Sequence, residues 1–186
     1  GQRATVGAIE RVRIDPETLE PNFKTVGSEL WSAEPDFELS LAETGVTGIC
    51  GSGIIEVVAE MYLAGIISAD GVIDGALAQR SPRLSQEGRT WSYVLHFADE
   101  QTSSNVVVTQ NDVRQIQLAK AALYAGIKLL MDRLNITSVD RIRLAGAFGS
   151  HISVTHAMIL GLIPDCPLEN VSPAGNAASM GARLAL

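Results

Sequence analysis

The 186 residues are enough for one domain or two small lobes, and a hydrophobic share of 46% supports a buried core. The net charge of −7 and the pI near 4.9 argue against the clustered basic face that nucleic acids require, and against binding to an anionic membrane surface. No apolar run approaches the ~18 residues of a membrane-spanning helix.

The N-terminal part of the chain has the pattern of strands. Residues 4–14 alternate partly between apolar and polar side chains, which predicts a strand, and a turn signal follows at 15–18. We expect a second strand at 23–26 and a short one at 37–41. The chain has no initial methionine and begins within a strand pattern, so we expect it to be the C-terminal part of a longer protein.

A helix is predicted over 51–64, directly after a stretch with four glycines. Its apolar side chains form a broad surface, and Glu56 and Glu60 lie four residues apart on the other side, where we expect Glu60 to face solvent. Residues 80–104 are polar and poorly patterned, and we interpret them as a variable insertion that contains one strand at 90–97.

The longest predicted helix begins at Thr109, where Thr109 and Asp112 form a variant of the capping box, and it ends near Leu134 with Asn135 as the C-cap. Apolar residues at helical spacing predict its core stripe: Ile116, Ala119, Leu123, Ile127, Leu130 and Leu134. A strand at 106–108 precedes this helix. A strand at 139–145, a helix at 154–160, a strand near 171 and a helix at 177–186 follow it.

Strands and helices that alternate in this way predict an α/β fold with partly parallel strands. Ligands of such sheets bind at the carboxyl ends of the strands. Three glycine-bearing turns fall at predicted strand ends: 45–53, 146–149 and 175–176. Their common position favours a binding site more than any one of them does.

The turn at 45–53 has the composition of a phosphate-binding loop before a helix, with the hydroxyls of Thr47 and Ser52 as further donors. It is neither a Walker A loop, since it has no lysine, nor a dinucleotide fingerprint, since the third glycine is missing. A tight loop without a ligand remains the alternative.

The remaining candidates for a site are Gly146, Glu56, the two cysteines and the three histidines. Gly146 lies at a strand end where a flat group such as adenine could lie over bare backbone, or where a strand and a helix pack closely. Glu56 is the carboxylate best placed to order a magnesium-bound water. Cys50 and Cys166 stand in no metal-binding pattern, which indicates free thiols in a reducing compartment. The three histidines share no metal-like spacing.

Several strings of the sequence resemble one family, the reductive activators of corrinoid-dependent enzymes. They are Gly1-Gln-Arg-Ala4, Gly7-Ala-Ile-Glu10, Gly48-Ile-Cys-Gly-Ser-Gly-Ile54, Thr109-Gln-Asn-Asp112, Gln117-Leu-Ala-Lys120, Leu144-Ala-Gly-Ala-Phe-Gly149, Gly161-Leu-Ile-Pro164 and Gly175-Asn-Ala-Ala178. The similarity covers nearly the whole chain outside 80–104. Gln2 departs from the methionine expected in the first string.

The resemblance implies an actin-like ATPase lobe of the acetate-and-sugar-kinase type, with a ribonuclease H-like mixed sheet flanked by helices, over 1–186. It implies that Gly48, Gly51, Ser52 and Gly53 contact phosphate. It further implies that Gly146, Ala147, Phe148 and Gly149 contact adenosine, with Gln117 and Lys120 near the ribose. Gly175 and Asn176 form the third candidate turn.

The implied function is that of an ATP-dependent activator in the cytoplasm that returns cob(II)alamin to cob(I)alamin in a corrinoid protein or corrinoid-dependent methyltransferase. ATP with Mg²⁺ would be shared with an N-terminal lobe absent from this chain, and a [2Fe–2S] domain would lie upstream. The chain alone is then expected to be inactive, and a homodimer stays open. Two alternatives remain: a lobe of a small-molecule kinase with the same fold, and a non-catalytic docking module.

Overall fold

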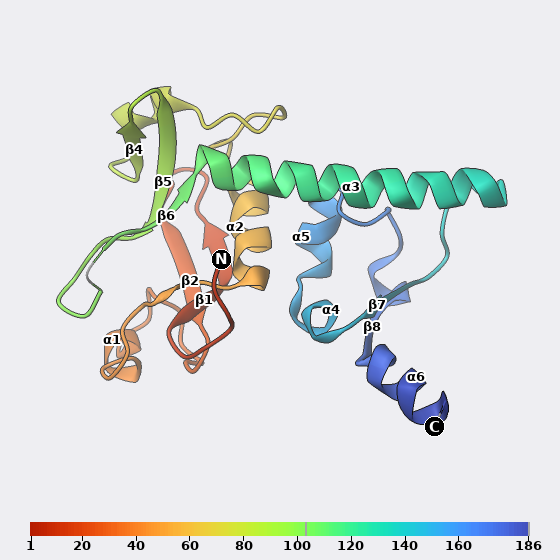
Figure 1. Cartoon of the computed structure of the whole chain (residues 1–186). Helices are drawn as coiled ribbons and strands as arrows, with labels where there is room; N and C mark the ends of the chain where they lie inside the picture. The colour runs from red at the N-terminus through yellow and green to blue at the C-terminus, as the bar shows by residue number, and fades with distance from the viewer. Residues whose placement is uncertain (103, 186) are drawn as a thin grey trace. The chain divides into compact units, whose positions relative to one another are not determined.

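The computed structural model describes residues 1–102 and 104–185, and the side chains at 147 and 148 lie outside this description. The chain divides into two compact units, Gly1–Gln117 and Leu118–Leu186. Helix α3 (Gln110–Leu134) crosses the boundary between them (Figure 1).

The first sheet of unit 1 has the strand order β2-β1-β3, in which β1 (Ala8–Ile14) is antiparallel to β2 (Pro21–Thr25) and parallel to β3 (Gly48–Ile49). The predicted turn at 15–18 is confirmed. The carboxylate of Asp15 accepts the N–H groups of Thr18 and Glu17, and these bonds lower its pKa. Helix α2 (Gly51–Leu63) has nearly the predicted bounds and packs along β1 (Figure 1).

The second sheet of unit 1 is an antiparallel meander of β4 (Leu84–Glu87), β5 (Thr90–His96) and β6 (Val106–Thr109). The strands predicted at 90–97 and 106–108 are confirmed. Strand β4 and the short 3-10 helix Gly75–Gln79 were not predicted. Tyr93 anchors this sheet, because it is fully buried and its hydroxyl donates to the carbonyl of Leu19 at 2.8 Å. Burial raises the pKa of Tyr93.

The strand predicted at 37–41 is wrong. Helix α1 (Phe37–Ser40) occupies this segment, and the N–H of Ser40 donates to the carbonyl of Asp36. Phe37 and Leu41 are buried, whereas Leu39 is 72% exposed. An alternating apolar pattern of five residues fits one helical turn as well as a strand.

Helix α3 begins with the predicted capping box. The carboxylate of Asp112 accepts the N–H of Thr109 at 2.8 Å, and the hydroxyl of Thr109 accepts the N–H of Asp112. Asn135 follows the helix with a φ of 54°, as a C-cap does. The predicted core stripe is wrong, because Leu123 and Leu130 are 50% and 61% exposed. Helical spacing of apolar residues predicts an apolar face but does not show what covers it.

Unit 2 contains a parallel pair of strands, β7 (Ile142–Ala145) and β8 (Val171–Gly175). Its helices are α4 (Ala147–His151), α5 (Val154–Ile159) and α6 (Ala177–Ala185), with a short 3-10 helix at Leu168–Asn170. The two parallel pairs, β1–β3 and β7–β8, confirm the predicted partly parallel α/β order. Among the described residues, no helix has the length and apolar composition to cross a membrane.

Candidate functional site

The glycine turn of unit 1 is held against β1 and leads into α2. The N–H of Thr47 donates to the carbonyl of Gly7, and the N–H of Cys50 donates to the carbonyl of Ile9. Gly45 and Gly48 have positive φ angles, 59° and 147°, which side chains disfavour. The strand predicted to lead into this turn is helix α1, and the turn itself contains the two-residue strand β3 directly before α2.

The N-terminus of α2 has no side-chain cap, and Ser52 and Gly53 in its first turn are buried. Its N-cap, Cys50, makes no side-chain cap, and the first turn carries no acidic residue. The first N–H groups of a helix have no partner within the helix, and the helix dipole favours an anion beside them. The N–H groups of Gly51, Ser52 and Gly53 therefore suit a phosphate.

The side chains of the turn differ in their roles. The hydroxyl of Thr47 is exposed and accepts the amide of Gln2 at 2.7 Å. Ser52 is buried, with its hydroxyl 3.2 Å from the sulfur of Cys50. At Gly53, a Cβ atom would lie 2.4 Å from the carbonyl oxygen of Ile9, so this glycine allows α2 to approach β1.

Gln2 contacts this turn, although no sequence pattern predicts the contact. Its backbone N–H donates to the carbonyl of Ile49, and a Cβ atom on Gly48 would lie 2.9 Å from its side-chain oxygen. The amide of Gln2 therefore covers the bare backbone of the turn. Gln2 and Thr47 are 45 residues apart in the sequence, so no local pattern indicates this contact.

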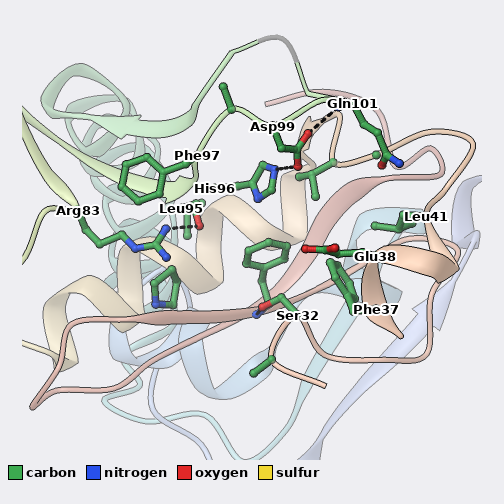
Figure 2. Close-up of a pocket in the computed structure, with 16 residues that line it drawn as sticks. Ser32, Phe37, Glu38, Leu41, Arg83, Leu95, His96, Phe97, Asp99 and Gln101 are labelled. Carbon is green, nitrogen blue, oxygen red and sulfur yellow. Dashed lines mark hydrogen bonds and ion pairs between the residues drawn. The ribbon is translucent and has the colours of Figure 1, made fainter. Parts of the chain in front are cut away.

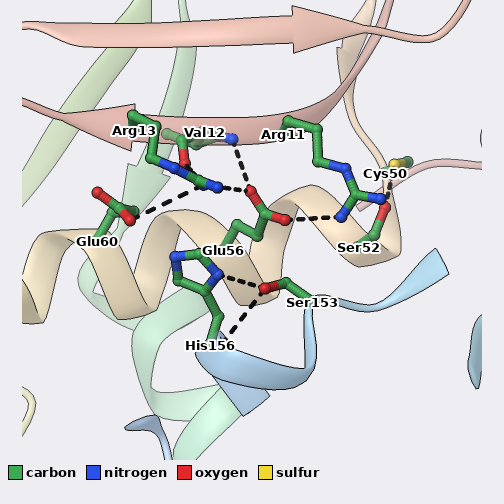
Figure 3. Close-up of polar contacts among 9 residues, drawn as sticks. All are labelled: Arg11, Val12, Arg13, Cys50, Ser52, Glu56, Glu60, Ser153 and His156. Atoms are coloured by element: carbon green, nitrogen blue, oxygen red, sulfur yellow. Dashed lines mark hydrogen bonds and ion pairs between the residues drawn. The ribbon is translucent and has the colours of Figure 1, made fainter. Parts of the chain in front are cut away.

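Glu56 is not available for the magnesium-bound water that was expected beside it. It is 1% exposed, and its carboxylate accepts the N–H of Val12 at 3.0 Å and guanidinium N–H groups of Arg11 and Arg13 at 2.8 and 2.9 Å (Figure 3). Glu60 is also buried, and it accepts the N–H of Ile14. Glu60 does not face solvent as expected, and the carboxylate of Glu56 binds groups of β1 rather than a magnesium-bound water.

The carboxyl ends of β7 and β8 bring the two glycine turns of unit 2 together. The N–H of Gly146 donates to the carbonyl of Gly175 at 2.8 Å. Both residues have positive φ, 94° and 63°, and a Cβ atom on either would meet no atom within 4 Å. The edge between α4 and α6 thus presents bare backbone.

The neighbours of these glycines have structural roles. A Cβ atom on Gly149 would lie 2.9 Å from the backbone of Leu144, which is close strand–helix packing. The side-chain oxygen of Asn176 accepts the N–H of Ser179 and caps α6. The side chains of Ala147 and Phe148 lie outside the described residues.

Gln117 and Lys120, which were both expected near the ribose, have different surroundings. The amide of Gln117 donates to the carbonyl of Asp70 and fills the space above Gly71. Lys120 lines a cavity of about 410 Å³ in unit 2 with Tyr124, Gly161 and ten other residues. The glycines at 146–149 and 175–176 do not line this cavity.

Metal ligands are not gathered within the described ranges: no group of three or more His, Cys, Asp and Glu side chains there could hold a metal ion. Cys50 and Cys166 are free thiols. A plant-type [2Fe–2S] cluster takes four cysteines, so this chain does not fit one.

Comparisons with known proteins agree with one another. The family model described as "C-terminal domain of RACo the ASKHA domain" matches residues 1–186. The "Corrinoid activation enzyme RamQ" of Eubacterium limosum is 32% identical over 194 residues, which cover 100% of this chain and 30% of that protein. A solved structure, the "Reductive activator for corrinoid,iron-sulfur protein", superposes with a TM-score of 0.81 at 32% identity, covering 100% of this chain and 27% of that one. The predicted actin-like α/β fold is confirmed.

Proposed function

This chain belongs to the family of C-terminal ASKHA domains of corrinoid reductive activators, and we propose that it is the nucleotide-binding lobe of such an activator. The whole protein would use ATP to return cob(II)alamin to cob(I)alamin in a corrinoid protein or corrinoid-dependent methyltransferase. The names of the two relatives support this activity, and the chain spans less than a third of the length of each.

The observation that carries the proposal is the uncapped N-terminus of α2 behind a glycine turn. The N–H groups of Gly51, Ser52 and Gly53 would bind phosphate oxygens, with Gly48 and the hydroxyl of Thr47 beside them. ATP, when bound, would supply these oxygens and the free energy that biases the lobes between two arrangements.

The adenosine would lie on the bare edge of unit 2. Gly146 and Gly175 leave space over their backbones, and the backbone of 147–149 and Asn176 continue this edge. The role of Lys120 near the ribose stays a prediction, since the cavity that Lys120 lines includes neither Gly146 nor Gly175. Gln117 and Glu56 are left out of the proposal, because their polar groups are committed to Asp70 and to β1.

Magnesium and the [2Fe–2S] cluster would be held elsewhere in the longer protein. Because Glu56 is engaged by two arginines, we expect the magnesium-facing acid to come from an opposing lobe. We accordingly expect negligible ATPase activity and weak nucleotide affinity for the chain alone. A homodimer and a cytoplasmic location stay predictions.

Of the two alternatives, the docking module has one observation in its favour: Gly53 and Gly149 have packing roles that need no nucleotide. The kinase lobe has none in this chain, and the family match supports the activator instead.

The test is an NMR titration of the ¹⁵N-labelled chain with a non-hydrolysable ATP analogue. We expect saturable shifts at the N–H groups of 51–53, 146 and 175, and their loss in Gly51→Val. The matched control is Gly88→Asn in the exposed β4–β5 turn, where a φ of 61° suits asparagine and a Cβ meets no atom within 4 Å. Binding that survives Gly51→Val unchanged would contradict the proposal.

A further inference from the structure

A pocket in unit 1 has no role in the proposed nucleotide site. Its volume is about 380 Å³, and it lies between β2, α1 and the segment that follows β5 (Figure 2). Its apolar wall consists of Phe23, Phe37, Leu41, Leu95 and Phe97. The Phe23 ring meets Phe37 edge-on at 5.8 Å, and Phe97 is 41% exposed at the rim.

The basic groups of this pocket are already paired. The Arg83 guanidinium binds Glu20 at 2.7 Å, donates to the carbonyls of Val94 and Leu95, and lies over Phe97. The ring of His96 is 2.9 Å from the carboxylate of Asp99. Neither side chain is left to attract an anion.

The acidic side of the pocket remains available. The carboxylate of Glu38 points toward the middle of the pocket in Figure 2, and no hydrogen bond or ion pair engages it among residues 1–102 and 104–185. Residues 28–46 contain four glutamates and one aspartate but no lysine or arginine, and residues 97–105 add Asp99 and Glu100 without a base. The potential over the pocket is therefore negative.

We propose that this pocket docks a basic side chain, arginine or lysine, from a partner protein, together with the apolar residue beside it. Aromatic faces attract a cation, and the aliphatic stem of arginine or lysine packs on apolar walls while its charge reaches a carboxylate. The cavity exceeds the needs of one such side chain, which leaves room for an apolar neighbour. Glu38 would repel an acidic segment and would give a neutral one no charge attraction.

The pocket is joined to the glycine turn. Gly45 and Val46 belong to its lining, the hydroxyl of Thr102 donates to the carbonyl of Val46 at 3.0 Å, and the amide of Gln101 donates to the carbonyl of Ala42. A partner docked here would contact the segment that leads to residues 47–53. A link between docking and nucleotide binding rests on the proposed function, whereas the docking itself does not.

The probe is the dipeptide acetyl-Phe-Arg amide, titrated into the ¹⁵N-labelled chain, with acetyl-Phe-citrulline amide as its uncharged isostere. We expect saturable shifts around Phe23, Phe97 and Gly45 with a Kd in the millimolar range, and binding about five-fold weaker for citrulline. Equal binding of the two dipeptides, shifts away from the pocket, or no saturation at about 10 mM would overturn the proposal.

Two variants and one control complete the test. Glu38→Gln removes the charge and should weaken the arginine dipeptide about two- to five-fold without changing the citrulline one. Phe97→Ala should weaken both. Glu87→Gln, an exposed carboxylate outside the pocket, should change neither, and an equal loss in this control would overturn the proposal. The probe has no phosphate, so its failure leaves the nucleotide proposal untouched.

Discussion

Replacing Glu56 tests the polar contact that joins α2 to β1. In Glu56→Ala the buried N–H of Val12 loses its acceptor, and a buried donor without a partner costs about 1–3 kcal/mol. The bonds to Arg11 and Arg13 involve side chains that are 36% and 51% exposed, so solvent screening reduces each to roughly 0.2–1 kcal/mol. We expect Glu56→Ala to lower the free energy of unfolding of unit 1 by about 3 kcal/mol.

Glu56→Gln separates the charge from the hydrogen bond. The glutamine oxygen can still accept the N–H of Val12 but no longer neutralises the two guanidinium groups, so we expect a loss of about 1 kcal/mol. Urea unfolding followed by tryptophan fluorescence measures both variants, since the two tryptophans, Trp31 and Trp91, lie in unit 1.

The control for this prediction is Glu29→Ala. Glu29 is fully exposed and 3.8 Å from Lys24, so its removal should change the free energy of unfolding by less than about 0.5 kcal/mol. If Glu56→Ala were no more destabilising than Glu29→Ala, the reasoning about the buried carboxylate would be refuted.

Two further predictions concern packing and pH. Gly53→Ala should destabilise unit 1 by about 1–3 kcal/mol, because its Cβ atom would clash with the carbonyl oxygen of Ile9. Gly126→Ala lies inside α3 with open space around it and should stabilise the helix by about 0.5–1 kcal/mol. Urea unfolding monitored by circular dichroism measures both variants. The N–H of Thr102, the N–H of Gln101 and the adjacent histidine lower the pKa of Asp99. The contribution of Asp99 to the loop is therefore complete above its unfolded pKa of about 3.9 and is lost as the pH falls through its lower folded pKa.

The amide shifts of 101 and 102 report this loss. They should move toward disordered values only below about pH 4, and Asp99→Ala, which removes the acceptor oxygen, should show the moved values already at pH 7. Shifts of Asp99→Ala that match the parent chain at pH 7 would contradict the role of this carboxylate. A gain in stability for Gly53→Ala would likewise contradict the close approach of α2 to β1.

The fold could be predicted where the signals are local. Helix α3 combines a long helical period with a capping box, and both ends lie where the sequence places them. The glycine turns could be predicted because clustered glycines interrupt the apolar patterns of strands and helices. Two short elements were not predicted correctly. Helix α1 has a single turn, and its apolar residues alternate as they would in a strand. Strand β4 buries only Leu84 of its four residues, so it has no alternating pattern.

The site could be predicted in its backbone but not in its side chains. Helical periodicity placed Glu56 away from the apolar surface, yet its partners on β1 are 43 to 45 residues distant and no spacing rule connects them. Gln2 reaches Thr47 over the same separation. Contacts between distant segments depend on strand pairing, which the sequence pattern leaves undetermined.

The central claim is that the N-terminus of α2 binds the phosphates of a nucleotide. A crystal structure of the complete protein with a non-hydrolysable ATP analogue tests this claim most directly. We predict that phosphate oxygens lie within hydrogen-bond distance of the N–H groups of 51–53. An analogue whose phosphates lie elsewhere, with these N–H groups unoccupied, would contradict the claim.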